Sequence, residues 1–178
     1  MQLAIFEIPQ LTPVLRYLLI SILSLSLSQA FGQTMGLIEY SDTSSIGYTL
    51  FSPFSSENTY LIDQCGHSIH QWNHETKPTS VYLLDDARLL RHERVQSDVF
   101  GGGGTAGQLS IYNWDGTVDW TYLLANDSLH SHHDIAFLPN GNIAAIAWEY
   151  RDSDECDNAG RDPSTYANAV FTPIIIEL

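Results

Sequence analysis

Two pairs of similar segments recur about fifty residues apart in this chain. Residues 60–66 match residues 110–116, which start 50 residues later, and residues 80–90 match residues 134–144, which start 54 residues later. A repeat of about this length that contains four short strands is typical of the blades of a β-propeller. A β-sandwich also has many short strands, but it needs no such self-similarity. The propeller is therefore the favoured fold, with the sandwich as the alternative.

The mature part of the chain is expected to consist of β-strands. Short runs of branched and aromatic residues alternate with Gly, Asn, Asp and Pro, and no dozen residues combine a helical period with caps. The expected strands cover residues 47–51, 59–63, 68–72, 80–84, 88–91, 108–112, 117–122, 134–138, 142–148 and 173–178. The predicted fold class is all-β, an incomplete β-propeller made of its first two to three four-stranded blades.

The number of expected strands is too small for a closed ring. A propeller needs at least four blades, and residues 34–178 supply fewer than that. Residues 172–178 look like a new strand that is cut off before its hairpin partner, and a bare apolar edge strand promotes aggregation. We therefore expect the chain to be the N-terminal fragment of a longer protein. An oligomer that completes the ring is the alternative.

The first 32 residues have the layout of a secretory signal peptide. Arg16 precedes an apolar run over residues 17–27, and small residues follow it. The run is too short to span a bilayer comfortably. We expect cleavage after Gly32, with Ala30 as the second choice, and a secreted or periplasmic product. A misplaced start codon and an uncleaved anchor remain open, because the region before the run is long and has only one basic residue.

The charge of the chain limits its partners. The net charge is −14, whereas nucleic acids and anionic membranes require a basic surface. We therefore expect no nucleic-acid partner, and no membrane contact after signal cleavage. An anionic substrate would need a local cationic pocket. Besides the histidines, the cations available for one are Lys77, Arg88, Arg91, Arg94, Arg151 and Arg161.

Residues 130–134 carry three histidines and an aspartate directly before a strand, a turn and a second strand. This density of imidazoles is typical of a site that transfers protons or binds an anion or a metal. A polar loop with chance histidines is the alternative. The pattern H-x-H-x-D also resembles zinc hydrolases of the metallo-β-lactamase type. However, Ile135 stands where that motif continues with histidine, and no fourth zinc donor is evident, so no metal or other cofactor is expected.

Several segments together resemble the bacterial arylsulfotransferase (aryl-sulfate sulfotransferase) family. They include the HHDI sequence at 132–135 and the LPNGN sequence at 138–142, and the resemblance covers residues 46–178. The other segments are residues 47–53, 59–63 with Gly66 and Trp72, 101–104, 111–116, 148–149 and 159–163. The individual segments are short, but their order and spacing are specific. The resemblance implies a six-bladed propeller with its site on the central channel, and residues 33–178 as the N-terminal blades.

The resemblance also implies an activity. Such enzymes transfer a sulfuryl group from an aryl sulfate donor to a phenolic acceptor through a histidine intermediate, without a nucleotide donor. His132 and His133 look like the family's first channel histidines, as catalytic residues that contact sulfate or transfer protons. Arg161 is a further candidate for substrate binding. The family's sulfuryl-accepting histidine and sulfate-binding arginine come from later blades, so the chain alone is expected to be inactive.

The alternative function is a non-catalytic secreted propeller that binds a ligand or a partner.

Four other features of the sequence have interpretations of their own. Residues 101–104 are either a flexible loop or a set of backbone N–H groups that line an anion site. The acidic run over residues 152–157 is expected to be a solvated loop. Cys65 and Cys156 could pair, which the sequence does not decide. The remaining histidines, His67, His70, His74 and His92, are assigned no role.

Overall fold

The computed structural model describes residues 12–14, 39, 41, 43 and 45–178. Almost all of the expected signal peptide lies outside the described residues. The chain divides into two units, residues 1–40 and 41–178, and the fold below is that of the second unit. In the described part of the chain, the helices are too short or too polar to cross a membrane.

The second unit is built from antiparallel β-sheets, which confirms the all-β prediction. The strands are β1 (Thr49–Phe51), β2 (Thr59–Ile62), β3 (Ser68–Trp72), β4 (Pro78–Leu83), β5 (Leu89–Arg94), β6 (Gly107–Tyr112), β7 (Val118–Leu123), β8 (Leu129–Phe137), β9 (Ile143–Asp152) and β10 (Ala169–Glu177). They form a sheet of order β1-β2-β3, a sheet of order β4-β5-β6-β7 and a sheet of order β10-β9-β8. In each sheet, strands that follow one another in the sequence are hydrogen-bonded neighbours.

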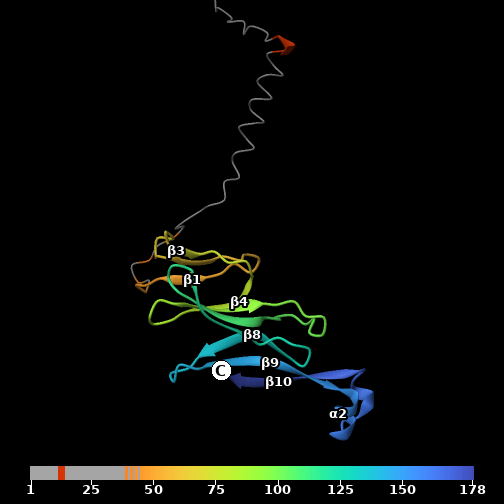
Figure 1. Ribbon diagram of the computed structural model, residues 1–178. Coiled ribbons are helices and arrows are strands. Elements are labelled where there is room, and N and C mark those ends of the chain that lie inside the picture. The colour runs from red at the N-terminus through yellow and green to blue at the C-terminus, as the bar shows by residue number, and fades with distance from the viewer. Residues whose placement is uncertain (1–11, 15–38, 40, 42, 44) are drawn as a thin grey trace, which may run out of the picture. The chain divides into compact units, whose positions relative to one another are not determined.

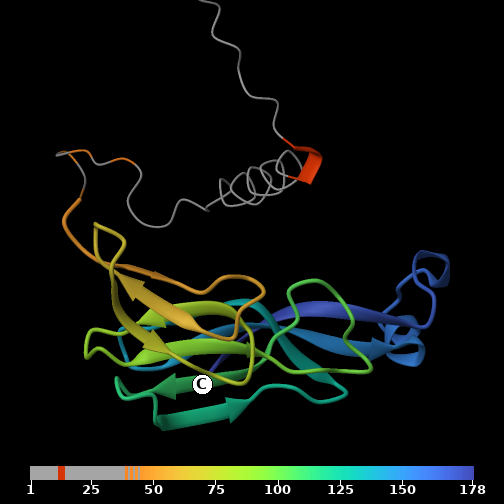
Figure 2. The same cartoon turned by 90° about the horizontal axis from the view of Figure 1, so that it is seen from above.

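The three sheets lie one upon another, as Figure 1 shows from the side and Figure 2 from above. The four-stranded sheet is the middle layer. One cluster of buried side chains, which includes Leu61, Trp72 and Leu89, fills the space between β1-β2-β3 and this middle sheet. A second cluster, which includes Leu90 and Ile143, fills the space between the middle sheet and β8-β9-β10. Strand β5 supplies alternate residues to both clusters, because successive side chains of a strand point to opposite faces.

A buried ion pair within β5 is linked to the first sheet through Thr59 of β2. The Arg91 Nε atom lies 2.9 Å from Glu93 Oε1, and both side chains are almost fully buried. The guanidinium also donates to Thr59 Oγ1 and to two backbone carbonyls. Glu93 accepts hydrogen bonds from Gln108, Ser110 and Tyr112. Each charge is therefore held by several partners, as burial of an ion pair requires.

Four of the hairpin turns have the same backbone hydrogen bonds. In the turns at residues 63–67, 84–88, 113–117 and 138–142, the first residue's N–H donates to the fifth residue's carbonyl, and the fourth residue's N–H donates to the first residue's carbonyl. The fourth position has a positive φ in every case. Glycine occupies it three times, and Ala87, with φ 65°, occupies it once. The fourth residue of this turn must adopt the left-handed conformation, which glycine reaches without steric strain.

Within the second unit, the expectation of strands alone is wrong at two places, of which one is the short 3₁₀ helix η1 (Pro163–Thr165). Residues Ser153–Asn158 form helix α2, where the sequence predicted a solvated loop. Asp152 caps the helix: its side chain accepts from the Glu155 N–H, and the Glu155 side chain accepts from the Asp152 N–H. This capping box satisfies two backbone donors and places acidic charge at the positive end of the helix. Because the helix has only six residues, the sequence shows no helical period of apolar residues that would predict it.

Candidate functional site

Strand β8 contains an irregularity at the histidines. Ser131 pairs with Ala147 on β9, and the next paired residue, Ile135, is opposite Ala145. Three residues of β8, His132 to Asp134, therefore stand opposite the single residue Ile146. Bulges of this kind redirect side chains and are frequent beside functional sites. The sequence predicted a strand that begins at Asp134, with the histidines directly before it. In the structure β8 begins at Leu129, and the histidines lie inside the strand.

His133 adopts a backbone conformation that is unusual for a residue with a side chain. Its φ is 58°, in the left-handed region. Its N–H donates to the Gly104 carbonyl at 2.7 Å, which ties the bulge to the glycine-rich loop. A Cβ atom on Gly104 would lie 2.5 Å from His133 Nε2. The His133 ring can therefore adopt its position only because residue 104 is glycine. A strained backbone held by its surroundings is a recognised mark of functional sites.

His132 is the buried member of the pair. Its ring stacks on Trp148 with centroids 4.0 Å apart, and only 7% of the residue is exposed. Its Nε2 atom is buried and has no hydrogen-bond partner in the described part of the chain. Burial, together with repulsion from His133, lowers the pKa of His132 below its usual value. His132 therefore stays neutral near pH 7.

The two imidazoles share one proton. The His132 Nδ1 and His133 Nδ1 atoms lie 2.7 Å apart, so one of them donates and the other accepts. If neutral His133 donates, its Nε2 carries a lone pair that can accept a proton. If His132 donates, the Nε2 of neutral His133 carries hydrogen and can bind an oxyanion. Since His133 is exposed, the pair can offer either function without movement of its rings.

The other two histidines around β8 have structural partners. His130 is buried, and its Nε2 donates to the Ala106 carbonyl at 2.8 Å. His92, on β5, is fully buried and its Nε2 lies 2.9 Å from Ser131 Oγ. Burial lowers the pKa of His92 to about 4. No pattern in the sequence connects His92 with the cluster, because 39 residues separate it from Ser131.

Asp134 completes the bulge on its other side. Its Oδ1 atom accepts from the Tyr82 hydroxyl at 2.7 Å and from the Ile135 N–H at 2.9 Å. Partial burial opposes ionisation of Asp134, but these hydrogen bonds outweigh it and lower the pKa. Burial and the bond to Asp134 raise the pKa of Tyr82 to about 12. This contact joins β8 to β4, the first strand of the middle sheet.

The zinc pattern H-x-H-x-D is not assembled. His130 points to the Ala106 carbonyl and Asp134 points to Tyr82, so their donors are turned to different partners. Among the described residues, the one group of donors close enough to hold a metal is elsewhere, in the turn Asp63, Cys65 and His67.

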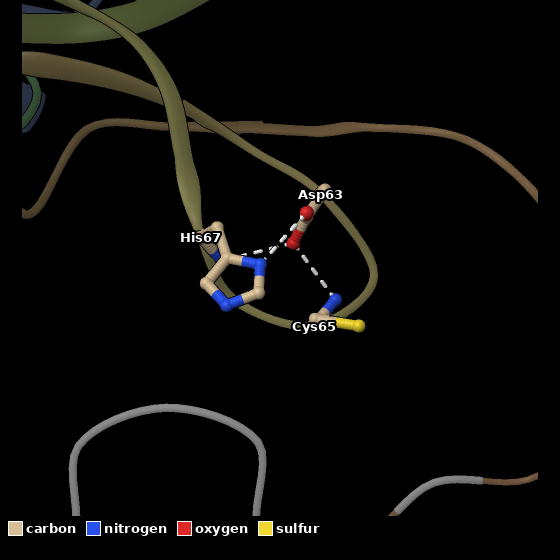
Figure 3. A group of neighbouring side chains, drawn as sticks. All are labelled: Asp63, Cys65 and His67. Atoms are coloured by element: carbon tan, nitrogen blue, oxygen red, sulfur yellow. Dashed lines mark hydrogen bonds and ion pairs between the residues drawn. The ribbon is translucent and has the colours of Figure 1, made fainter.

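Figure 3 shows how this turn is built. Asp63 Oδ1 accepts from the Cys65 and His67 N–H groups, both at 2.8 Å, and Asp63 Oδ2 lies 3.0 Å from His67 Nδ1. The Cys65 thiol points away from the other two donors. The hydrogen bonds of the turn therefore account for Asp63 and His67. Cys65 is exposed and Cys156 is buried, and neither forms a disulfide.

Arg161 lies apart from the histidine pair. It lines a pocket beside α2 and β10 together with Cys156 and Val170, and the lining of that pocket includes neither His132 nor His133. Its Nε atom lies 3.3 Å from Thr165 Oγ1, and its guanidinium is over the Tyr166 ring. The structure therefore brings His132 and His133 together but does not bring Arg161 to them.

Two residues that contact the pair were missing from the predicted site. Trp148 stacks on His132. Gly104 contacts His133, and the run of four glycines in the sequence was the signal for it. Comparisons of this chain with protein families, with curated proteins and with solved structures found no match.

Proposed function

We propose that this chain forms the first blades of a secreted six-bladed propeller of the arylsulfotransferase type, and that His133 transfers protons in its reaction. In this reaction a sulfuryl group leaves an aryl sulfate, is carried on a histidine that the resemblance places in a later blade, and passes to a phenol. A propeller would need sheets in addition to the three described. The proposal rests on one observation, the bulge in β8 that places the His133 ring within hydrogen-bonding distance of His132.

The turns support the propeller. The equivalent turns at residues 63–67 and 113–117 lie 50 residues apart, and those at 84–88 and 138–142 lie 54 apart. Strands β2 and β6 directly precede the first pair of turns, and β4 and β8 directly precede the second pair. On this basis β2 is equivalent to β6, and β4 is equivalent to β8. Strands β4 and β8 are the first strands of their sheets and are linked by Tyr82 and Asp134. First strands that lie side by side are the arrangement expected around a propeller axis.

The histidine pair supports the proton transfer. Sulfuryl transfer resembles phosphoryl transfer, in which the protein mainly positions the groups and stabilises charge. When the S–O bond of the donor breaks, protonated His133 gives its Nε2 proton to the leaving phenolate. In the second half-reaction neutral His133 takes the proton of the acceptor phenol as its oxygen attacks sulfur. Neutral His132 accepts from His133 Nδ1 throughout and thereby fixes the ring.

The proposal is tested with the protein in its natural length. A chromogenic aryl sulfate and a phenol are supplied, and the released phenolate and the sulfated acceptor are measured. General acid–base groups typically contribute about 10² to 10⁴ in rate. We expect His133→Ala to lower kcat/KM by about a hundredfold or more, and His67→Ala, on the exposed turn, to leave it within about twofold.

Two outcomes would contradict the proposal, the first its enzymatic activity and the second the role of His133. The first is the absence of turnover and of a sulfated histidine in the natural-length protein, which would favour the non-catalytic binding propeller. The second is turnover that His133→Ala leaves unchanged, which would remove His133 from the reaction.

A further inference from the structure

The turn at residues 63–67, between β2 and β3, differs from the three turns that share its backbone hydrogen bonds. In the other three, the third residue is an aspartate or an asparagine, and its side chain accepts from the fifth residue's N–H. Here the third residue is Cys65, whose thiol is a weak acceptor. Asp63, the first residue, accepts from the N–H groups of Cys65 and His67 instead. The turn therefore forms without the Cys65 side chain, and its shape does not explain the cysteine.

Three donors of different chemistry meet at this turn. One ligand atom from each of Asp63, Cys65 and His67 lies within 4.8 Å of those of the other two. Carboxylate, thiolate and imidazole are the side-chain ligands that zinc accepts in proteins. Magnesium and calcium prefer oxygen ligands throughout, and a thiolate does not suit them. The composition of the group therefore favours zinc over the harder cations.

The fold of the turn already holds two of the donors in place. Asp63 Oδ1 accepts from two backbone N–H groups, which fixes the carboxylate. Asp63 Oδ2 lies 3.0 Å from His67 Nδ1, in a contact that is open to solvent on the histidine side. Zinc would take the place of the proton in this contact, and the neutral imidazole would carry its hydrogen on Nε2. Both backbone hydrogen bonds of Oδ1 would stay, so zinc binding leaves the turn intact.

The Cys65 thiol completes the site by rotation. It points away from the other two donors in Figure 3, but Cys65 is exposed, so its side chain can turn about the Cα–Cβ bond. Two ligand atoms on one zinc ion lie about 3.5 Å apart, which leaves at most about 1 Å to close. A pocket of about 270 Å³, which Asp63 and Cys65 line together with Ile46 and Tyr48, has room for a water molecule as the fourth ligand.

We propose that Asp63, Cys65 and His67 bind one zinc ion, with water as the fourth ligand. The thiolate is the form of cysteine that binds metals, so binding releases the thiol proton to solvent. The ion ties the end of β2 to the start of β3 and stabilises this hairpin. The turn belongs to the first sheet, whereas the histidine pair belongs to the third. The zinc site is therefore separate from the proposed reaction and does not rest on it.

The first test titrates the reduced, metal-free protein in its natural length with Co²⁺, which replaces zinc and absorbs light. In the wild type we expect the near-ultraviolet charge-transfer band of a thiolate bound to cobalt. Cys65→Asn should lose this band. The variant should still fold, because Asn140 occupies the equivalent position in the turn at residues 138–142. The matched control, Cys156→Ala, removes the buried cysteine and should keep the band in full.

The second test measures zinc affinity by competition with a chelating dye. His67→Ala should weaken zinc binding by about tenfold or more, since even the loss of a group that supports a metal ligand costs about 10- to 100-fold. Asp63→Asn should weaken it as well, and its amide oxygen can still accept the backbone hydrogen bonds of the turn. Zinc should raise the melting temperature of the wild type and not that of Cys65→Asn, because only a ligand of the folded state stabilises it.

Three results would overturn the site. They are a wild-type cobalt spectrum without a thiolate band, an equal band in Cys65→Asn, and equal zinc affinity in the wild type and His67→Ala. None of them bears on the proposed reaction, which is judged by turnover and by the His133→Ala variant.

Discussion

The Nδ1 atoms of His132 and His133 lie 2.7 Å apart, and only His133 reaches solvent. The two adjacent residues thus have different environments, because the bulge turns one ring onto Trp148 and the other onto Gly104. This difference separates two neighbouring residues that the sequence treated alike. In the proposed reaction His132 is the positioning residue, and His133 is the member of the pair that is exposed to a substrate.

The contact between Gly104 and His133 gives the first prediction. Gly104→Ala should displace the His133 ring, because its Cβ would lie 2.5 Å from Nε2 and φ at this position is 78°. Imidazole nitrogen NMR should show altered His132 and His133 resonances. Gly103→Ala is the matched control, since a Cβ there meets no atom within 4 Å. Unchanged imidazole resonances in Gly104→Ala would contradict the contact.

His92 should make the stability of the protein depend on pH. Its pKa is about 4 when folded and 6.5 ordinarily, so the unfolded chain binds more protons between these values. The His92 contribution is therefore fully present above pH 6.5 and is lost as the pH falls toward 4, by up to ~3 kcal/mol. Urea denaturation at several pH values measures it. His92→Gln should flatten this part of the profile, and an unchanged slope would refute the assignment.

The buried ion pair should matter more than an exposed one. Arg91→Met leaves the Glu93 carboxylate buried without its counter-charge, and we expect the free energy of unfolding to fall by about 3–5 kcal/mol. Arg88→Met breaks an exposed pair with Asp86 and should lower it by less than about 1 kcal/mol. Chemical denaturation of both variants tests the difference. Similar losses would show that Arg91 and Glu93 contribute no more than surface charges.

Ala87 offers a stabilising substitution. It has φ 65° at the turn position that glycine occupies in the other three turns. Ala87→Gly should raise the free energy of unfolding by about 0.5–1 kcal/mol, because glycine relieves the strain of the left-handed conformation. The reverse change, Gly116→Ala, should lower it by about 1 kcal/mol in the same kind of turn. Thermal melting of the two variants should shift in opposite directions.

The sequence by itself determined the local structure. Alternating apolar residues and Gly or Asn turns predicted ten strands in the right order. Most of their bounds are correct to within a few residues, because strand and turn preferences depend on neighbouring residues. The largest errors lie in β8 and β10, which begin earlier than predicted, in β9, which extends past its predicted end to Asp152, and in the short helix α2, whose capping box was not recognised.

Only the tertiary structure decided the site. The positive φ of His133, the stacking of His132 on Trp148 and the link from His92 to Ser131 all depend on segments distant in sequence. The sequence also predicted that Arg161 binds substrate together with His132 and His133. In the structure Arg161 lines a different pocket, whereas Arg94 lines a pocket with the glycine-rich loop that contacts His133. Local patterns fix which residues form strands. Which side chains meet is fixed by how the sheets pack, since close packing allows only one arrangement of the facing surfaces.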